Sequence, residues 1–324
     1  MSASLVGSEM CIRDRAYIYG FLPTDFGRVS DAMMESATDN SVYTWENNSI
    51  YYITNGIWSP LKRVDDGWGF WDGVRSANLF LENFDPKVLE RFQYNEDYDE
   101  MIDKASKFSL EVRFLRAFYL FELAKRYGDI PLITRTYTQE EINSVRKTSF
   151  ADVIDFIAKE CTEITREGGL PEDGVRGETG RVTKGAALAL KSRALLYAAS
   201  DLHNPAHDLT KWEAAAKAAY EVIKMNKYQL PNVSTDPLYS DLGGNEVLKS
   251  KQLIFERRAI ATTSDFESRN EPMGYEGAEG GNTPTQNLVD AYEMKDGTPF
   301  DWNNPTHVAN MYSVSYTHLT LPTT

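Results

Sequence analysis

The chain has 324 residues, 42% of them hydrophobic, and a formal net charge of −14. This charge argues against a nucleic-acid-binding protein, because phosphates require clustered Lys and Arg, and against electrostatic docking on anionic lipid. No run of about eighteen apolar residues occurs, so the sequence predicts no membrane-spanning helix.

The two ends of the chain differ in character from the sequence between them. Residues 1–15 have no helical or strand period, and both they and residues 313–324 resemble translated sequencing-adapter read-through. We therefore expect both segments to be artefacts that pack on nothing, which leaves residues 16–312 as the folded part. Cys11 lies in the first segment and is not interpreted as a lipidation site.

The first predicted elements are short. Residues 16–20 are expected to close a helix, and residues 41–60 predict a loop with one short helix or strand. Residues 68–83 place apolar side chains on one side of a helix. Phe84-Asp85-Pro86 stops that helix, because proline disfavours helix in the residue before it. Residues 87–105 predict a separate polar helix.

The strongest predicted helix covers residues 109–128. Ser109 is expected to cap its start, and Gly128 is expected to end it. Large apolar side chains, such as Leu115 and Phe118, cover much of its circumference. This distribution indicates burial on several sides.

Three further helices are predicted at residues 149–167, 183–200 and 211–227. Ser149 with Asp152, and Thr210 with Glu213, have the spacing of capping boxes. The stripe of apolar residues expected to face the core in the last helix is Trp212, Ala215, Ala219, Val222 and Ile223. Together with residues 109–128, these helices predict two stacked antiparallel hairpins.

The helical period is lost beyond residue 228. Residues 251–257 predict a strand, residues 264–285 predict a Gly-rich surface loop, and residues 285–292 predict one short helix. Cys161 lies among apolar residues at helical spacing and is expected to be buried. Two cysteines provide neither a disulfide framework nor a metal signature.

Catalytic and metal sites have little support in the sequence. Paired carboxylates could serve glycoside hydrolysis, but each pair lies in a polar stretch and nothing places two carboxyls across one cleft. The pairs considered are Asp65 with Asp66, Asp97 with Asp99, and Glu140 with Glu141. A proline separates His203 from His207, so they are not expected to share a helical face. We predict no catalytic residue, no metal and no cofactor.

Aromatic residues in loops are the main candidates for ligand binding. A pyranose ring presents an apolar C–H face that aromatic rings bury well, and nearby Asn, Asp and Arg can hydrogen-bond its hydroxyls. Residues 43–58 have this combination, and the Gly-rich loop adds one more tyrosine. The predicted ligand-binding residues are Tyr43, Trp45, Asn47, Tyr51, Tyr52, Trp58 and Tyr275.

Four long segments, in order along the chain, match the signature stretches of one family. They are WDGVRSANLFLENF (71–84), EVRFLRAFYLFELAKRYGDIPLI (111–133), GRVTKGAALALKSRALLYAAS (180–200) and TPTQNLVDAYEMKDG (283–297). On these segments the chain resembles the SusD/RagB family of outer-membrane nutrient-binding, starch-binding-like lipoproteins. The resemblance covers about residues 16–312.

The resemblance implies a mostly α fold of tetratricopeptide-like helical hairpins with long irregular loop insertions. It also implies a non-enzymatic, lipid-anchored protein of a Bacteroidetes-type outer membrane, facing outward. Such proteins bind an oligosaccharide, or for some members a peptide or other nutrient. They deliver it to a TonB-dependent SusC-like transporter in polysaccharide utilization.

The family's signal peptide, lipid-anchoring cysteine and distal C-terminal region do not appear in the sequence. We therefore expect the natural protein to extend beyond both ends. A helical protein-docking scaffold without small-ligand binding is the alternative interpretation, because helical hairpin surfaces commonly bind proteins.

Overall fold

The structure of the chain is a computed structural model. It describes residues 14–23, 28–65, 67–173, 180–230, 250–257, 265–294 and 297–309. The chain divides into two compact units. We call residues 1–22 with 67–259 the helical unit, and residues 23–66 with 260–324 the loop unit. Residues 313–324 and 1–13 of the predicted artefacts lie outside the described residues.

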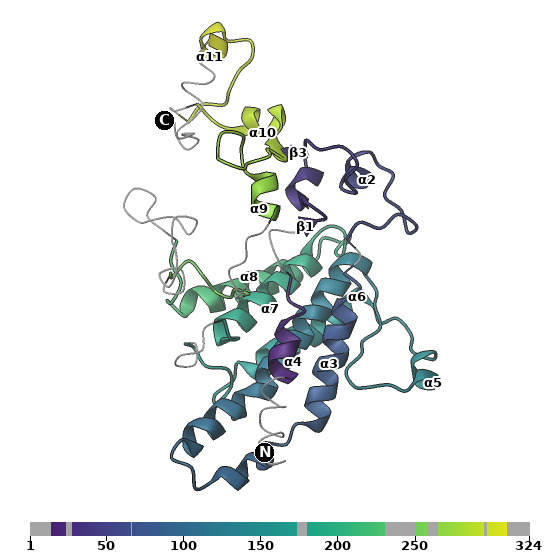
Figure 1. Cartoon of the computed structure of the whole chain (residues 1–324), viewed down its shortest axis with the longest axis vertical. Helices are drawn as coiled ribbons and strands as arrows, with labels where there is room; N and C mark the ends of the chain where they lie inside the picture. Colours follow the sequence, from purple (N-terminus) through teal and green to yellow (C-terminus); the bar gives the residue numbers. More distant parts are fainter. Residues whose placement is uncertain are drawn as a thin grey trace. The chain divides into compact units, whose positions relative to one another are not determined.

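Five helices build most of the helical unit. They are α3 (Phe70–Asn83), α4 (Tyr98–Tyr127), α6 (Phe150–Ile164), α7 (Lys184–Ala199) and α8 (Leu209–Lys224). Each packs against the next one in this order, as Figure 1 shows. The predicted mostly α architecture is confirmed. Within the described residues, no helix is both long enough and apolar enough to span a membrane.

Shorter elements connect these helices. Residues 14–19 form a further helix, in line with the predicted helix end at residues 16–20. The 3-10 helix η2 (Pro86–Phe92) precedes α4, and the four-residue helix α5 (Gln139–Ile142) lies between α4 and α6. Its N-cap Thr138 forms a capping box with Glu141.

Local signals set several helix ends as predicted. The Ser149 hydroxyl accepts a hydrogen bond from the backbone N–H of Asp152 at 3.2 Å and begins α6. The Thr183 hydroxyl does the same for Ala186 at the start of α7, at 3.4 Å. Gly128 ends α4 at a φ of 68°, which costs glycine little because it has no Cβ.

Two predicted helix starts are wrong. Ser109 lies inside α4, which begins at Tyr98 and contains the last part, residues 98–105, of the separate helix predicted at residues 87–105. The added residues bury Ala105 and Phe108 in the core, so tertiary packing extends the helix past its local signal. At α8 the N-cap is Asp208, whose carboxylate accepts a hydrogen bond from the Thr210 backbone N–H at 2.9 Å.

The predicted strand at residues 251–257 is also wrong, because this segment consists of turns and irregular chain. Its backbone is held at Lys251, whose carbonyl accepts a hydrogen bond from the Gln229 N–H at 3.0 Å, and its side chains add further contacts. The Phe255 ring meets the Phe114 ring edge to face, with centroids 5.5 Å apart. Arg257 Nη1 also donates to the Leu22 carbonyl at 2.5 Å, so both a ring contact with α4 and hydrogen bonds hold this segment.

Helix α4 forms the centre of the core. Leu115, Leu120 and Phe121 are fully buried, which confirms the predicted burial of this helix, whereas Phe118 is half-buried. Helix α3 approaches α4 closely at Gly73, where an added Cβ would lie 2.7 Å from Cδ2 of Tyr119. Cys161 is buried as predicted, and burial raises the pKa of its thiol to about 12.

A buried carboxylate on α4 ties three segments of the helical unit together. Glu111 accepts a hydrogen bond from Tyr19 Oη at 2.6 Å and from Arg181 Nε at 3.0 Å, and it forms an ion pair with Arg15 Nη1 at 3.2 Å. Tyr19 Oη also accepts a hydrogen bond from the Val182 N–H. Burial, followed by the charge of Glu111, raises the pKa of Tyr19 well above its ordinary value.

Arg15 corrects the prediction that residues 1–15 pack on nothing. Its side chain is buried, pairs with Glu111 and places its guanidinium 4.3 Å from the centre of the Phe108 ring. Residue 15 therefore belongs to the packed part of the helical unit. The composition of residues 1–15 gave no sign of this contact, because the partner is 96 residues away.

A second polar network joins α3, α4 and α6. Arg113 binds Glu160 at 2.7 Å and Glu163 at 2.6 Å, and Arg116 binds Glu160 at 3.0 Å. Arg116 also donates to Asn78 Oδ1 on α3 at 2.9 Å. Burial opposes ionisation of Glu160, but the hydrogen bonds and charge of the arginines lower its pKa overall.

The loop unit has little regular structure. It contains β1 (Arg28–Val29), β2 (Ala32–Met33), the 3-10 helix η1 (Met34–Ala37), β3 (Ser41–Tyr43), α2 (Tyr51–Thr54), α9 (Asp265–Asn270), β4 (Asn282–Pro284), α10 (Gln286–Ala291) and α11 (Pro305–Ala309). Strands β1 and β2 form one antiparallel pair, and β3 and β4 form another. The predicted short helix at residues 285–292 is confirmed as α10, and α9 and β4 lie where a loop was expected.

The core of the loop unit is small. Its buried hydrophobic residues are Val29, Ala32, Tyr43 and Ile50. Side-chain hydrogen bonds to the backbone add to it. Asn270 on α9 donates to the Asp31 carbonyl at 2.7 Å, and Arg269 forms an ion pair with Asp31 at 3.1 Å. The order of this unit therefore depends on polar contacts as well as on burial.

Candidate functional site

The pairing of β3 with β4 joins the two segments that carry the predicted ligand-binding residues. Tyr43 pairs with Asn282, and the Thr44 N–H donates to the Gly281 carbonyl at 2.8 Å. The Thr44 hydroxyl donates to the Gly280 carbonyl at 3.0 Å. The chain at Trp45 thus leaves the sheet beside the end of the Gly-rich loop that contains Tyr275.

Asn282 holds this junction from inside. Its side-chain carbonyl accepts hydrogen bonds from the hydroxyls of Ser36 at 2.7 Å and Ser41 at 2.8 Å. Reasoning from the sequence did not single out Asn282, because its partners are more than 240 residues away along the chain. The sequence offered one signal, which is that Asn282 directly precedes the fourth signature segment, residues 283–297.

Three of the predicted residues expose their aromatic rings. Trp45 is 49% exposed, Trp58 is 57% exposed and Tyr275 is 52% exposed. Trp45 lies at a bend, Trp58 lies in irregular chain, and Tyr275 lies in an isolated β-bridge with Met273. Their rings are therefore accessible for stacking on a ligand.

Tyr43 is not available for ligand stacking, which corrects its assignment as a ligand-binding residue. Its side chain is only 2% exposed and belongs to the core of the loop unit. Gly281 packs against its ring, where an added Cβ would lie 2.8 Å from Cε2 of Tyr43. Burial, followed by the charge of Asp31, raises the pKa of the Tyr43 phenol.

The structure gives Tyr51 a hydrogen bond to the backbone and gives Asn47 a turn conformation, and the sequence predicted neither. The Tyr51 hydroxyl donates to the backbone carbonyl of Tyr43, so this ring braces α2 against β3. Asn47 is exposed in a turn with a φ of 64°, a conformation that asparagine tolerates better than most residues. Next to it, Asn48 Oδ1 accepts a hydrogen bond from the Ile50 N–H at 2.9 Å.

The ammonium group of Lys62 lies near the ring of Tyr52. Lys62 Nζ lies 5.3 Å from the ring centre, within the range of a cation–π contact. Lys62 was not predicted as a site residue, and nothing in its local sequence distinguishes it from a solvated surface lysine. Its proximity to Tyr52 follows from the turn at Ser59–Lys62, where the Lys62 N–H donates to the Ser59 carbonyl at 2.9 Å.

Two of the groups considered for catalysis, Glu141 and His203, make structural contacts, and Asp66 lies outside the described residues. Arg135 and the backbone N–H of Thr138 hold the pKa of Glu141 at about 2, so this carboxyl is not a proton donor near neutral pH. His203 stacks on Phe150 with ring centroids 3.6 Å apart, and burial lowers its pKa. Within the described ranges, no group of three or more His, Cys, Asp or Glu residues is placed to hold a metal ion.

Comparison of the chain with protein-family models and with curated proteins gives no match. Solved structures do match. A SusD-like protein from Bacteroides fragilis is 27% identical, with a TM-score of 0.71 over 90% of this chain and 54% of its own. A SusD-like carbohydrate-binding protein from the same species is 24% identical, with a TM-score of 0.65 over 94% of this chain and 57% of its own.

A laminarin-binding SusD-like protein is 22% identical, with a TM-score of 0.53 over 71% of this chain and 46% of its own. The chain thus spans little more than half the length of the two Bacteroides fragilis structures. These similarities confirm the resemblance and the fold class predicted from the four segments.

Proposed function

We propose that this chain, which has the SusD-like fold, binds an oligosaccharide nutrient and delivers it to a TonB-dependent, SusC-like transporter at the outward face of an outer membrane. The proposal includes binding without chemical transformation, and lipid anchoring of the complete natural protein. Its ligand-binding surface would be the aromatic surface of the loop unit, which we define as Trp45, Tyr52, Trp58 and Tyr275.

The exposure of three large rings on one small, irregular unit is the observation that carries this proposal. Aromatic rings stack on the C–H faces of sugars, and amide side chains such as Asn47 supply donors and acceptors for hydroxyls. Two solved structures of this fold are described as carbohydrate-binding and laminarin-binding, which supports a glycan as the class of ligand.

Calorimetric titration with neutral oligosaccharides tests the proposal. A suitable panel contains the hexasaccharides of the malto, laminari, xylo and manno series. Trp45→Ala and Trp58→Ala should each weaken binding about fivefold, because one stacked ring contributes about 1 kcal/mol and 1.4 kcal/mol corresponds to tenfold. The matched control is Trp212→Ala, which removes a ring of similar exposure from the helical unit.

Unchanged affinity in both loop-unit variants would contradict the proposed surface. Chromatography of the titrated sugars gives the second readout. Shorter products would show that the protein is an enzyme and that the proposal of simple binding is wrong. Co-purification with a SusC-like transporter encoded beside the gene tests delivery separately from ligand binding.

A second candidate function, protein docking without a small ligand, has support on α8. Ala215 and Ala218 are its buried residues, whereas larger apolar side chains at helical spacing are exposed. These are Leu209, Trp212, Tyr220 and Ile223. The prediction that Trp212 and Ile223 face the core is therefore wrong, because small residues make the contact with α7. If Trp212→Ala abolished transporter association while no sugar bound, docking would replace binding as the function.

A further inference from the structure

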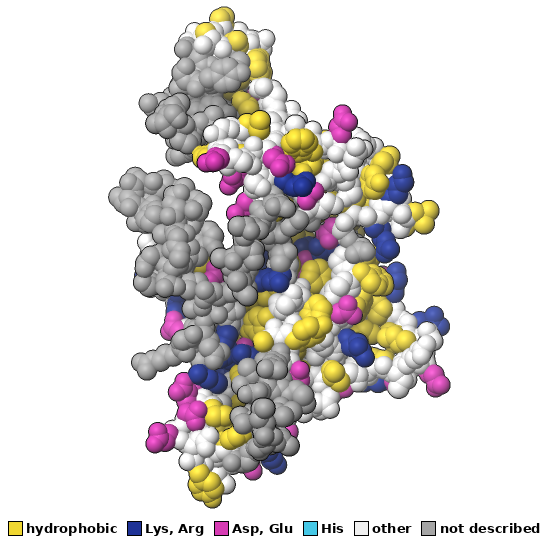
Figure 2. Space-filling model, viewed as in Figure 1, with side chains coloured by type: hydrophobic (Ala, Val, Ile, Leu, Met, Phe, Trp, Pro, Cys, Tyr) yellow, Lys and Arg dark blue, Asp and Glu magenta, His cyan; other side chains and the backbone are white. Residues whose placement is uncertain are grey.

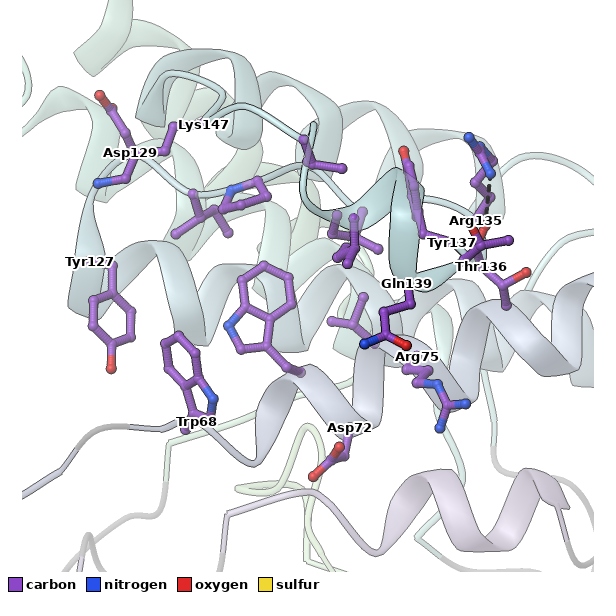
Figure 3. A pocket seen from close by; sticks show the side chains of 18 residues that line it. Trp68, Asp72, Arg75, Tyr127, Asp129, Arg135, Thr136, Tyr137, Gln139 and Lys147 are labelled. Carbon is purple, nitrogen blue, oxygen red and sulfur yellow. Dashed lines mark hydrogen bonds between the residues drawn. The ribbon is translucent and has the colours of Figure 1, made fainter.

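A pocket of about 680 Å³ lies within the helical unit. It is bounded by α3, by the C-terminal end of α4 and by the connection of residues 129–148, which carries α5 (Figure 3). Its volume falls in the range of small-molecule binding sites. None of its lining residues belongs to the aromatic surface of the loop unit.

One end of the pocket is aromatic. Trp68 is 57% exposed and Tyr127 is 39% exposed, and their rings meet edge to face with centroids 5.9 Å apart. Figure 3 shows them side by side at this end. The half-buried Trp71 adds a third ring, and Ile130 and Pro131 continue the apolar wall. Such a wall can bury the apolar face of a ring-shaped ligand.

Polar side chains line the rest of the pocket. Asp72 and Arg75 come from α3, Gln139 comes from α5, and Lys147 comes from the chain leading to α6 (Figure 3). All four are exposed, and in the described part of the chain none of their side chains forms a hydrogen bond or ion pair. Their donors and acceptors are therefore free to bind a ligand.

The charges of the lining are balanced. The carboxylates of Asp72 and Asp129 oppose the cations of Arg75 and Lys147, while Arg135 is already paired with Glu141 at 2.9 Å. On the face seen in Figure 2, basic and acidic side chains are likewise interspersed among hydrophobic ones. A balanced lining selects neither an anion nor a cation, but it suits a neutral ligand rich in hydroxyls.

Buried polar side chains hold the wall formed by residues 129–148. Asn78, which is 1% exposed, donates to the carbonyls of Ile133 at 3.2 Å and Arg135 at 3.1 Å. Arg116 donates to the Thr134 carbonyl at 3.0 Å and to Asn78 Oδ1 at 2.9 Å. The wall is thus attached to α3 and α4 by side chains that are themselves fixed in the core.

Further contacts hold both ends of this wall. Glu82 on α3 accepts hydrogen bonds from the N–H of Thr136 at 2.7 Å and from its hydroxyl at 2.6 Å. The Thr148 N–H donates to the Ile130 carbonyl at 2.8 Å. A pocket that is already formed loses little conformational freedom on binding, so more of the contact energy appears as affinity.

We propose that this pocket is a second binding site, which takes a short neutral oligosaccharide. Trp68, Trp71 and Tyr127 would cover the C–H faces of the sugar rings. Asp72, Arg75, Gln139 and Lys147 would hydrogen-bond the hydroxyls. The inference shares its class of ligand with the function proposed above, but it concerns different residues and can fail independently.

Tryptophan reporters distinguish the two sites in one experiment. The six tryptophans include Trp45 and Trp58 on the loop unit, Trp68 and Trp71 in the pocket, and Trp212 on α8 as an internal control. The chain is labelled with 5-fluorotryptophan, and its fluorine NMR resonances are assigned by single Trp→Phe variants. The probes are the four neutral hexasaccharides named above, with hexagalacturonate as an anionic comparator.

We expect the Trp68 and Trp71 resonances to shift saturably with at least one neutral hexasaccharide, while Trp212 stays unchanged. Shifts at Trp45 and Trp58 alone would overturn the pocket and leave the loop-unit site standing. Shifts at Trp68 and Trp71 alone would support the pocket and contradict the loop-unit site. If no neutral sugar shifts the pocket resonances, or only hexagalacturonate does, the inference is wrong.

Variants in the pocket provide the second measurement. Trp68→Ala should weaken the pocket's affinity, read from the Trp71 resonance, about five- to tenfold. Gln139→Ala should weaken it severalfold, whereas its neighbour Glu140→Ala should have no effect, because Glu140 does not line the pocket. Equal behaviour of the Gln139 and Glu140 variants would contradict the assigned hydrogen-bonding role.

Discussion

The two units of this chain are ordered by different interactions. In the helical unit, α4 is buried on several sides and crossed by two networks of buried charges around Glu111 and Glu160. In the described part of the loop unit, a small cluster of buried hydrophobic residues and a few side-chain hydrogen bonds hold short strands and turns. Irregular segments such as those of the loop unit commonly carry binding function.

The comparison predicts that the largest loss of stability follows from breaking the Glu111 network. Glu111→Gln should lower the free energy of unfolding by about 3–5 kcal/mol, because it leaves the buried Arg181 without its carboxylate. Urea denaturation measures the change. Glu140→Gln, at an exposed position on α5, is the control and should be near neutral. A small effect at Glu111 would mean that the arginines find other partners.

A cavity in the α4 core should have a similar or slightly smaller effect. Leu115→Ala is expected to cost about 2–5 kcal/mol, because the side chain is fully buried and its neighbours come from several helices. Leu79→Ala on α3 removes the same atoms at a 53% exposed position and should change the denaturation midpoint little. Equal midpoints for the two variants would show that α4 is peripheral.

The loop unit should respond locally. Ile50→Ala, in the small core, should cost about 2 kcal/mol, at the low end for such substitutions, because few neighbours surround it and they can relax. We expect faster hydrogen exchange and proteolysis within residues 28–65 without a change in the helical unit. Loss of protection in α4 as well would mean that the two units unfold together.

The smallest effect concerns acid stability. The pKa of Glu160 is lowered in the fold, so its contribution is present above the ordinary value of 4.5 and is lost as pH falls through the folded pKa. The slope for one proton is at most about 1.4 kcal/mol per pH unit. Unfolding measured from pH 6 to pH 3 should therefore show less pH dependence in Glu160→Gln. An unchanged slope would assign the acid sensitivity to other carboxylates.

Short-range signals were sufficient for the main helices. The apolar period predicted α3, α6, α7 and α8 within a few residues, and the predicted cap at Ser149 marks a real helix start. Such signals are local, because a cap and its first turn lie within four residues of each other. The start of α4 was missed because packing of Phe108 in the core, rather than a cap, extends it to Tyr98.

The candidate sites depended on contacts between distant residues. Composition predicted ligand binding by residues 43–58, but it could not separate the exposed Trp45 and Trp58 from the buried Tyr43. The pocket was not predicted at all. Its walls come from α3 and from residues 129–148, and the hydrogen bonds of Asn78 that join them span more than 50 residues.

The sequence by itself determined the mostly helical fold, the positions of its long helices and the family that it resembles. Periodicity, caps and signature segments are properties of contiguous residues, so they are readable before folding. Only the tertiary structure decided which aromatic rings are exposed, which face of α8 packs on α7, and how β3 meets β4. Burial of a side chain depends on what the rest of the chain places against it, and that information is not local.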